Sequence, residues 1–212
     1  MTAQLLPIHP DNPQQRLINQ AVKVLNDGGV VVYPTDSAYA LGCHIGDKNA
    51  MERIRRIRGL DSKHNFTLVC RDLSEISLYS KVGNAHYRLM KSLTPGPYTF
   101  ILKATREVPK RLQNPKRRTI GLRVPDNNIT SHILDTLHEP VMSSTLIMPG
   151  DDLPLVEPED MFDKLKHHVD LVIDGGFCGI EPTTVIDLVE EEPVVEREGK
   201  GDVSKFLDQH SY

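Results

Sequence analysis

Two periodicities run through the chain, and together they predict intermixed helices and strands. A helix is expected to begin after a cap at Asp11 or Asn12 and to end before Gly28. Its apolar residues recur at helical spacing: Leu17, Ile18, Ala21, Val22 and Leu25. The β-branched run from Val30 to Tyr33, closed by Pro34, then predicts a strand that is covered on both faces.

The same two signals continue to the end of the chain. Asp47 is a candidate cap for a second helix, in which Met51, Ile54 and Ile57 form an apolar stripe. Further helices are expected over residues 73–93 in two pieces broken at Gly83, over 128–137 and 159–168, and in a short piece near Val203. Strands are expected over residues 66–70, 98–103, 119–124, 141–145, 171–173, 184–188 and 194–196.

Several neighbouring predicted strands have no helix between them, so they cannot all be joined as parallel pairs. The expected fold is therefore a single α/β domain over residues 1–212, with its core at about 10–205 and a twisted mixed sheet flanked by helices. Residues 149–158 are rich in Pro, Asp and Leu and are expected to form one surface loop.

Composition narrows the class of protein. The 212 residues are 39% hydrophobic and 25% charged, with a formal net charge of -4, which is typical of a soluble globular domain. No apolar run is long enough for a membrane helix, and the first residues lack the pattern of a secretory signal. Three widely spaced cysteines fit neither a disulfide scaffold nor a metal site, so a cytoplasmic location is expected.

Common catalytic motifs are missing from the sequence. There is no GxxxxGK[ST] phosphate loop, no GxSxG nucleophile elbow and no HExxH or paired Cys/His spacing. The adjacent His167 and His168 point in different directions on a helix end, so no metal held by protein ligands is expected. What remains are hydroxyl and arginine side chains at the ends of predicted strands, and these suggest a crevice for an anionic ligand.

Ordered motifs then resemble a known family. The segment from Tyr33 to Gly42, YPTDSAYALG, is similar to the PTET-x-YGLG signature of the YrdC/YciO family, the threonylcarbamoyl-AMP synthases of tRNA modification. Matching elements follow in order: Arg56-Ile57-Arg58 (K-x-R), Thr94 to Thr99 (WPGPLT), Thr119 to Pro125 (T-x-x-x-R-x-P), Asp174 to Gly176 (GG), Pro182 to Asp187 (STV-x-D) and Arg197 to Gly199 (R-x-G). The YciO branch is the most similar.

The resemblance implies a YrdC-like fold with a concave basic cleft and a defined reaction. Threonine, bicarbonate and ATP, the last expected to enter with Mg²⁺, would form threonylcarbamoyl-AMP and pyrophosphate, with protein groups that position the reactants and no covalent nucleophile. The resemblance places Thr35, Arg123 and Thr183 near the amino-acid substrate. It places a second set near the nucleotide: Arg56, Arg58, Asn65, Thr119, Ser144 and Arg197.

Departures from the family pattern lie mainly in the expected binding site. The asparagine of the S-x-N element is Leu146, the lysine of K-x-R is Arg56, and the glutamate of PTET is Asp36. Loss of an amide that hydrogen-bonds a charged ligand predicts weakened synthase activity, which Leu146→Asn would raise.

Other functions remain open from the sequence. The chain could be a noncatalytic paralogue that binds double-stranded RNA, tRNA or rRNA through a basic group of residues, namely Lys110, Arg111, Lys116, Arg117 and Arg118. A reshaped pocket could instead adenylate a different carbamate or acyl acceptor. Several candidates also have a purely structural explanation: Thr35 as a turn cap, Arg56 and Arg58 as solvated helix residues, and Ser144 as a partner of backbone groups.

Overall fold

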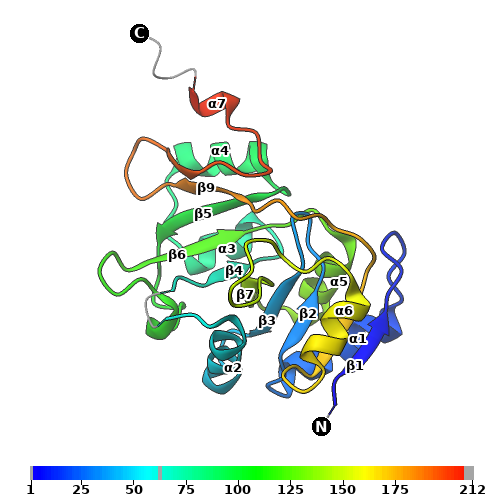
Figure 1. The fold of residues 1–212 in the computed structure, drawn as a ribbon. Coiled ribbons are helices and arrows are strands. Elements are labelled where there is room, and N and C mark those ends of the chain that lie inside the picture. The colour runs from blue at the N-terminus through cyan, green and yellow to red at the C-terminus, as the bar shows by residue number, and fades with distance from the viewer. Residues whose placement is uncertain (1, 62–63, 208–212) are drawn as a thin grey trace.

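The computed structural model describes residues 2–61 and 64–207, which form one sheet with helices on both of its faces (Figure 1). The strands are β1 (Gln4–Pro7), β2 (Val31–Tyr33), β3 (Ala40–His44), β4 (Thr67–Val69), β5 (Tyr98–Lys103), β6 (Thr119–Arg123), β7 (Val141–Thr145), β8 (Leu171–Asp174), β9 (Thr184–Asp187) and β10 (Val194–Arg197). The helices are α1 (Gln15–Asn26), α2 (Lys48–Arg58), α3 (Leu73–Tyr79), α4 (Asn84–Leu93), α5 (Asn128–Leu137), α6 (Pro158–Leu165) and α7 (Ser204–Leu207), with a 3-10 turn at Lys110–Leu112.

The strands follow the order β1-β8-β2-β3-β7-β4-β6-β5-β9-β10. Four neighbouring pairs are parallel, namely β1 with β8, β8 with β2, β4 with β6, and β5 with β9. The other pairs are antiparallel. The predicted single α/β domain with a mixed sheet is therefore confirmed. Figure 1 labels β9, β5, β6, β4, β7, β3, β2 and β1, which follow this strand order from the top of the picture to the lower right.

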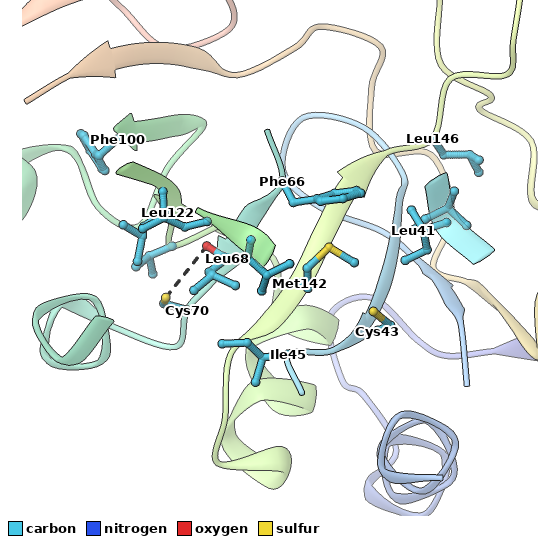
Figure 2. Packing of buried hydrophobic residues seen from close by; sticks show 14 of the residues in the cluster. Leu41, Cys43, Ile45, Phe66, Leu68, Cys70, Phe100, Leu122, Met142 and Leu146 are labelled. Carbon is cyan, nitrogen blue, oxygen red and sulfur yellow. Dashed lines mark hydrogen bonds between the residues drawn. The ribbon is translucent and has the colours of Figure 1, made fainter. Parts of the chain in front are cut away.

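Alternate residues of the strands point to opposite faces of the sheet, and each face has an apolar cluster. The larger cluster contains Leu68 of β4, Phe100 of β5 and Leu122 of β6, and α2, α3, α4 and α6 pack against it (Figure 2). The smaller cluster contains Val31 and Leu171, and α1 and α5 cover it. On this face α1 and α5 lie over the part of the sheet from β1 to β4, and none of the helices within residues 2–61 and 64–207 contributes to an apolar cluster over the part from β6 to β9.

Local sequence signals explain the well-predicted helices. The Asp47 carboxylate accepts a hydrogen bond from the Ala50 amide at 2.8 Å, so it caps α2 as expected. Gly83 separates α3 from α4 and is the residue before the first turn of α4. The loop expected at residues 149–158 is present up to the start of α6.

The structure differs from the sequence predictions at four places. Helix α1 starts at Gln15 because the amides of Asp11 and Asn12 donate to His9 Nδ1, forming a turn ahead of the helix. Helix α6 ends at Leu165, three residues earlier than expected. Strands β1 and β3 were not predicted, and β1 lies ahead of residue 10, where the core was expected to begin.

Candidate functional site

A cavity of about 410 Å³, here called the sheet cavity, lies on the part of the sheet face that α1 and α5 leave free. The alternation of β6 explains its floor. Thr119, Gly121 and Arg123 line the cavity, whereas Leu122 is buried in the larger apolar cluster; Ile120 belongs to that cluster and also borders the cavity. Two polar residues and a glycine at alternate positions of a central strand thus form the floor of the cavity.

Neighbouring strands add residues to this floor in the same way. The contributions are Thr67 from β4, Thr99 and Ile101 from β5, Ser143 and Thr145 from β7, and Val185 from β9. A Cβ atom at Gly121 would lie 3.1 Å from Thr67 Oγ1 and 3.3 Å from Thr99 Cγ2, so glycine keeps the floor open at this point.

The charged side chains that line the sheet cavity are cationic, although two of them, Arg117 and Arg123, are paired with Asp187 and Asp36 outside the lining. Four arginines line the cavity, namely Arg58, Arg117, Arg123 and Arg197, and no Asp or Glu is among the lining residues that the structure describes. Burial, followed by the nearby Arg58 and Arg55, lowers the pKa of His64, which also lines the cavity. Guanidinium groups are suited to carboxylate and phosphate, and the cavity therefore fits an anionic ligand.

Arg58 enters the cavity from the last turn of α2. Its Nε donates to Ser144 Oγ at 3.3 Å, and its Nη1 donates to the Ile147 carbonyl. Burial lowers the pKa of Arg58, since the apolar surroundings disfavour its charged form. An anion beside this guanidinium would replace the solvation that it has lost.

Arg123 is a buried charge that forms an ion pair with Asp36. Its Nη2 donates to the Asp36 carboxylate and its Nη1 donates to Ser37 Oγ at 3.3 Å, while both members of the ion pair have side chains only 9% exposed. The Asp126 amide holds the other carboxylate oxygen at 2.9 Å. A charge buried in an otherwise apolar strand requires such a partner. Arg123 Nε is buried and has no hydrogen-bond partner among the described residues.

Arg197 and Thr183 both line the sheet cavity and are hydrogen-bonded to each other. Arg197 Nη2 donates to the Thr183 carbonyl at 2.8 Å, and the Thr183 hydroxyl lies 2.9 Å from the Thr99 hydroxyl. Burial lowers the pKa of Arg197. This contact joins β10 to the segment before β9, so that residues 14 positions apart present a hydroxyl and a guanidinium side by side.

The structure brings most of the predicted site residues together. The sheet cavity is lined by Arg58, Asn65, Thr119, Arg123, Ser144, Thr183 and Arg197. Thr35 lies outside the lining; its hydroxyl donates to the Ala38 carbonyl at 2.6 Å, which is the turn-capping contact considered from the sequence. Arg56 lies outside it as well and lines a separate depression. Thr67 and Thr99 were not predicted, although their alternation with apolar strand neighbours is a signal that could have identified them.

The predicted RNA-binding residues divide into three groups. Arg117 lines the sheet cavity and forms a 2.6 Å ion pair with Asp187. Arg111 donates to the Ile45 and Gly46 carbonyls, so its guanidinium is already used within the fold. The others, Lys110, Lys116 and Arg118, are exposed.

Leu146 has its side chain in the apolar core, and Figure 2 labels it among the core residues. It is fully buried, and its amide donates to the Tyr39 carbonyl at 2.9 Å. Leu146 is not among the residues that line the sheet cavity. The expectation that this leucine deprives the site of a hydrogen bond therefore loses its geometric premise.

Neither a metal-binding group nor a membrane-spanning helix is found among the described residues. Within residues 2–61 and 64–207, no group of three or more His, Cys, Asp or Glu side chains is arranged to hold a metal ion. None of the helices in those ranges combines the length and apolar character needed to cross a membrane.

Comparison with known proteins identifies relatives of the whole chain. The Sua5/YciO/YrdC family model, described as "Telomere recombination", matches residues 23–199. The YciO protein of Escherichia coli K12, itself described as uncharacterized, is 61% identical over 205 residues, which are 97% of this chain and 100% of that protein. Its crystal structure has a TM-score of 0.93 and covers 96% of this chain and 99% of its own.

More distant relatives have a described activity. The threonylcarbamoyl-AMP synthase of Mus musculus is 27% identical over 195 residues, covering 86% of this chain and 68% of that enzyme. Sua5 of Pyrococcus abyssi in complex with L-threonine shares the fold with a TM-score of 0.86 at 21% identity, covering 99% of this chain and 61% of that one.

Proposed function

The chain belongs to the Sua5/YciO/YrdC family, and on that premise we propose that it is a nucleotidyltransferase of the threonylcarbamoyl-AMP synthase type. The observation that carries the proposal is the sheet cavity, in which four arginines and several Ser and Thr hydroxyls converge without a lining carboxylate. A site of this composition suits a substrate that carries a triphosphate and a second that carries a carboxylate.

The proposed reaction needs no nucleophile from the protein. Threonine and bicarbonate condense to the threonine carbamate with loss of water. A carbamate oxygen then bonds to the α-phosphorus of ATP as the bond to the bridging oxygen breaks, and pyrophosphate leaves. The rate enhancement comes from holding the two reactants in line and from cationic donors that stabilise negative charge on the phosphoryl oxygens.

We propose a division of the cavity between the two substrates, with Arg197 and Thr183, which are in contact, lying where the two ends meet. We assign Arg123 and Thr183 to the threonine end, where Arg123 Nε is a buried donor without a partner among the described residues. Thr35 shapes the turn beside that end. The nucleotide end is assigned to Arg58, Asn65, Thr119, Ser144 and Arg197. Mg²⁺ would enter on the phosphates of ATP, and the reaction would take place in the cytoplasm, where tRNA is modified.

The test is a pyrophosphate assay with ATP, threonine and bicarbonate, with threonylcarbamoyl-AMP detected by mass spectrometry. Arg197→Gln should lower the rate about tenfold to a hundredfold, since a hydrogen bond to a charged group contributes roughly 1.5–3 kcal/mol. Arg106→Gln is the matched control, because this arginine side chain is 95% exposed and lies outside the cavity lining. Absence of product at high enzyme concentration would overturn the proposal, and turnover only with another amine or acid would indicate the different-acceptor reaction.

RNA binding is the second candidate function, and the exposed cations of residues 110–118 favour it. Lys110, Lys116 and Arg118 are accessible to a phosphate backbone, whereas Arg111 is used internally. Binding of duplex RNA that weakens steeply with salt and is unchanged by ATP and threonine would support this function. Lys116→Gln should weaken it, and Lys91→Gln, which removes an exposed positive charge on α4, is the matched control.

A further inference from the structure

A second depression lies between α2 and α6, beside the sheet cavity. We call it the α2–α6 depression; its volume is about 570 Å³, within the range of small-molecule sites. Its lining is Arg53, Arg56, Ile57, Met148, Lys164, Leu165, His167 and His168. None of these residues lines the sheet cavity.

The polar part of the lining carries only cationic or potentially cationic side chains. Arg53 is held in place, since its Nη1 donates to Asp170 at 2.7 Å and its Nη2 to the His168 carbonyl at 3.0 Å. Arg56 uses only its Nε, which donates to the Glu52 carbonyl at 3.4 Å. Within the described part of the chain, the Nη atoms of Arg56 and the ammonium group of Lys164 have no ion-pair or hydrogen-bond partner. Two cations of the same lining therefore remain free to bind an anion.

The rest of the lining is apolar. Ile57 and Met148 are partly buried, Leu165 is buried, and all three also contact the larger apolar cluster. An exposed cationic rim over an apolar floor matches a ligand with phosphate groups at one end and a flat, weakly polar ring at the other. A simple phosphate would leave the floor unused.

We propose that the α2–α6 depression is a second binding site, for a nucleoside di- or triphosphate. Arg56 and Lys164 bind the phosphates, Arg53 supports them from its fixed position, and the base lies against Ile57 and Met148. The depression and the sheet cavity share a wall: α2 carries Arg56 to one and Arg58 to the other, while Ile147 and Met148 line the cavity and the depression respectively. A nucleotide in the depression is thus placed to act on the position of Arg58.

Binding of ADP measured by isothermal titration calorimetry tests the site independently of any synthase activity. The Arg197→Gln chain serves as the background, because Arg197 belongs to the sheet cavity and lies on β10, away from α2. In this background ADP should still bind. Adding Arg56→Gln and Lys164→Gln should weaken that binding at least tenfold. The matched control adds Lys81→Gln and Lys91→Gln, which remove two exposed positive charges elsewhere and should leave ADP affinity within twofold.

Three results would overturn the proposal. The first is the absence of ADP binding in the Arg197→Gln background. The second is equal weakening by both pairs of substitutions, which would indicate a general charge effect. The third is tripolyphosphate binding as tightly as ADP, which would show that the apolar floor takes no part. Thermal unfolding of the Arg56→Gln/Lys164→Gln chain separates ligand binding from stabilisation of the helix C-termini, because a role confined to those termini lowers the melting temperature without changing ADP affinity.

Discussion

Leu146 illustrates how one side chain's direction decides its role. Because it is fully buried among apolar residues, Leu146→Asn would place an amide where no partner is provided and would leave a small void. We expect the free energy of unfolding to fall by about 3 kcal/mol. Synthase activity should not rise. Urea unfolding and the pyrophosphate assay measure the two effects.

Leu146→Met is the matched control, because a volume-conserving apolar exchange costs less than about 1.5 kcal/mol. If Leu146→Asn were instead as stable as the unsubstituted chain and more active, position 146 would have to face the sheet cavity.

Asp36 is expected to position Arg123. The two side chains form a buried ion pair, and the carboxylate also accepts from the Asp126 amide. Asp36→Asn removes the negative charge and leaves a buried guanidinium without its counter-ion, so we expect a loss of about 3 kcal/mol in unfolding free energy. Threonine affinity, measured by calorimetry, should weaken as Arg123 loses its fixed orientation.

Asp126→Asn removes one negative charge from the same region while its backbone amide can still bind Asp36. It should therefore leave stability and threonine affinity nearly unchanged. Equal effects of the two substitutions would show that only local net charge matters.

Helix geometry explains why residues of one motif separate in space. Arg56 and Arg58 are two positions apart, which on a helix places them about 200° apart around the axis. Only Arg58 lines the sheet cavity. The sequence predicted both the helix and the motif. The predicted helix and the predicted motif together imply that Arg56 and Arg58 point in opposite directions and do not enter one site.

At the scale of elements, α2 contributes residues to both the sheet cavity and the α2–α6 depression. Its cap is the Asp47 carboxylate, which accepts from the Ala50 amide. Asp47→Ala should lower the unfolding free energy by about 1 kcal/mol, the usual cost of losing such a cap. Asp47→Asn keeps an acceptor and should cost much less. Guanidinium chloride unfolding distinguishes them, and an equal loss in both variants would contradict a capping role.

The first turn of α3 contains a carboxyl with a pH-dependent effect on stability. Burial raises the pKa of Glu75 above its ordinary value of 4.5, although its carboxylate accepts from the Arg71 amide at 2.6 Å. The folded chain therefore retains this proton to higher pH than the unfolded chain. The stabilisation that the protonated Glu75 carboxyl provides is complete below pH 4.5 and is lost as the pH rises through the pKa of Glu75 in the folded chain.

Glu75→Gln removes this titration. The unfolding free energy of the variant minus that of the unsubstituted chain should become more positive between pH 4 and pH 7, as urea unfolding would show. Glu190→Gln, at an exposed position, is the control. A difference for Glu75→Gln that stays constant across this range would refute the linkage.

Elements with strong local signals were predictable, and those formed by tertiary pairing were not. Strand β5 begins and ends where the sequence predicted, directly after the rigid turn at residues 94–97. Strand β3 contains Ala40, Gly42 and Cys43, residues with little strand preference, and it is held by pairing with β2 and β7 on its two sides. Strand β1 is only four residues long and ends in a proline. No local pattern distinguishes either from a loop.

At the scale of the whole molecule, the site is an assembly of distant segments. Arg58, Arg123 and Arg197 come from a helix, a central strand and the edge strand β10, and the order of the sheet brings them to one cavity. The family motifs predicted most members of this set. They could not show that Arg123 is paired with Asp36, since that contact depends on how the turn at residues 35–38 folds over the end of β6.

The edge position of β10 leads to a prediction about ligand-linked stability. This strand pairs on one side with β9, its residues are mostly exposed, and Arg197 joins it to the Thr183 carbonyl beside the cavity. Such a strand opens more readily than the core. ATP that binds Arg197 must hold β10 in place, and a ligand at 100 times its Kd adds about 2.7 kcal/mol to the folded state. Amide hydrogen exchange over residues 184–197 should therefore slow with ATP.

Two controls make this prediction specific to the sheet cavity. Adenosine lacks the phosphates that Arg197 would bind, so it should leave exchange in β10 nearly unchanged. Arg197→Gln should abolish the protection by ATP, whereas Arg106→Gln should retain it. The α2–α6 depression does not include β10, so a nucleotide bound only there would slow exchange in α2 and α6 and leave β10 unaffected. Protection of β10 that persists in Arg197→Gln would show that the phosphates do not reach this end of the cavity.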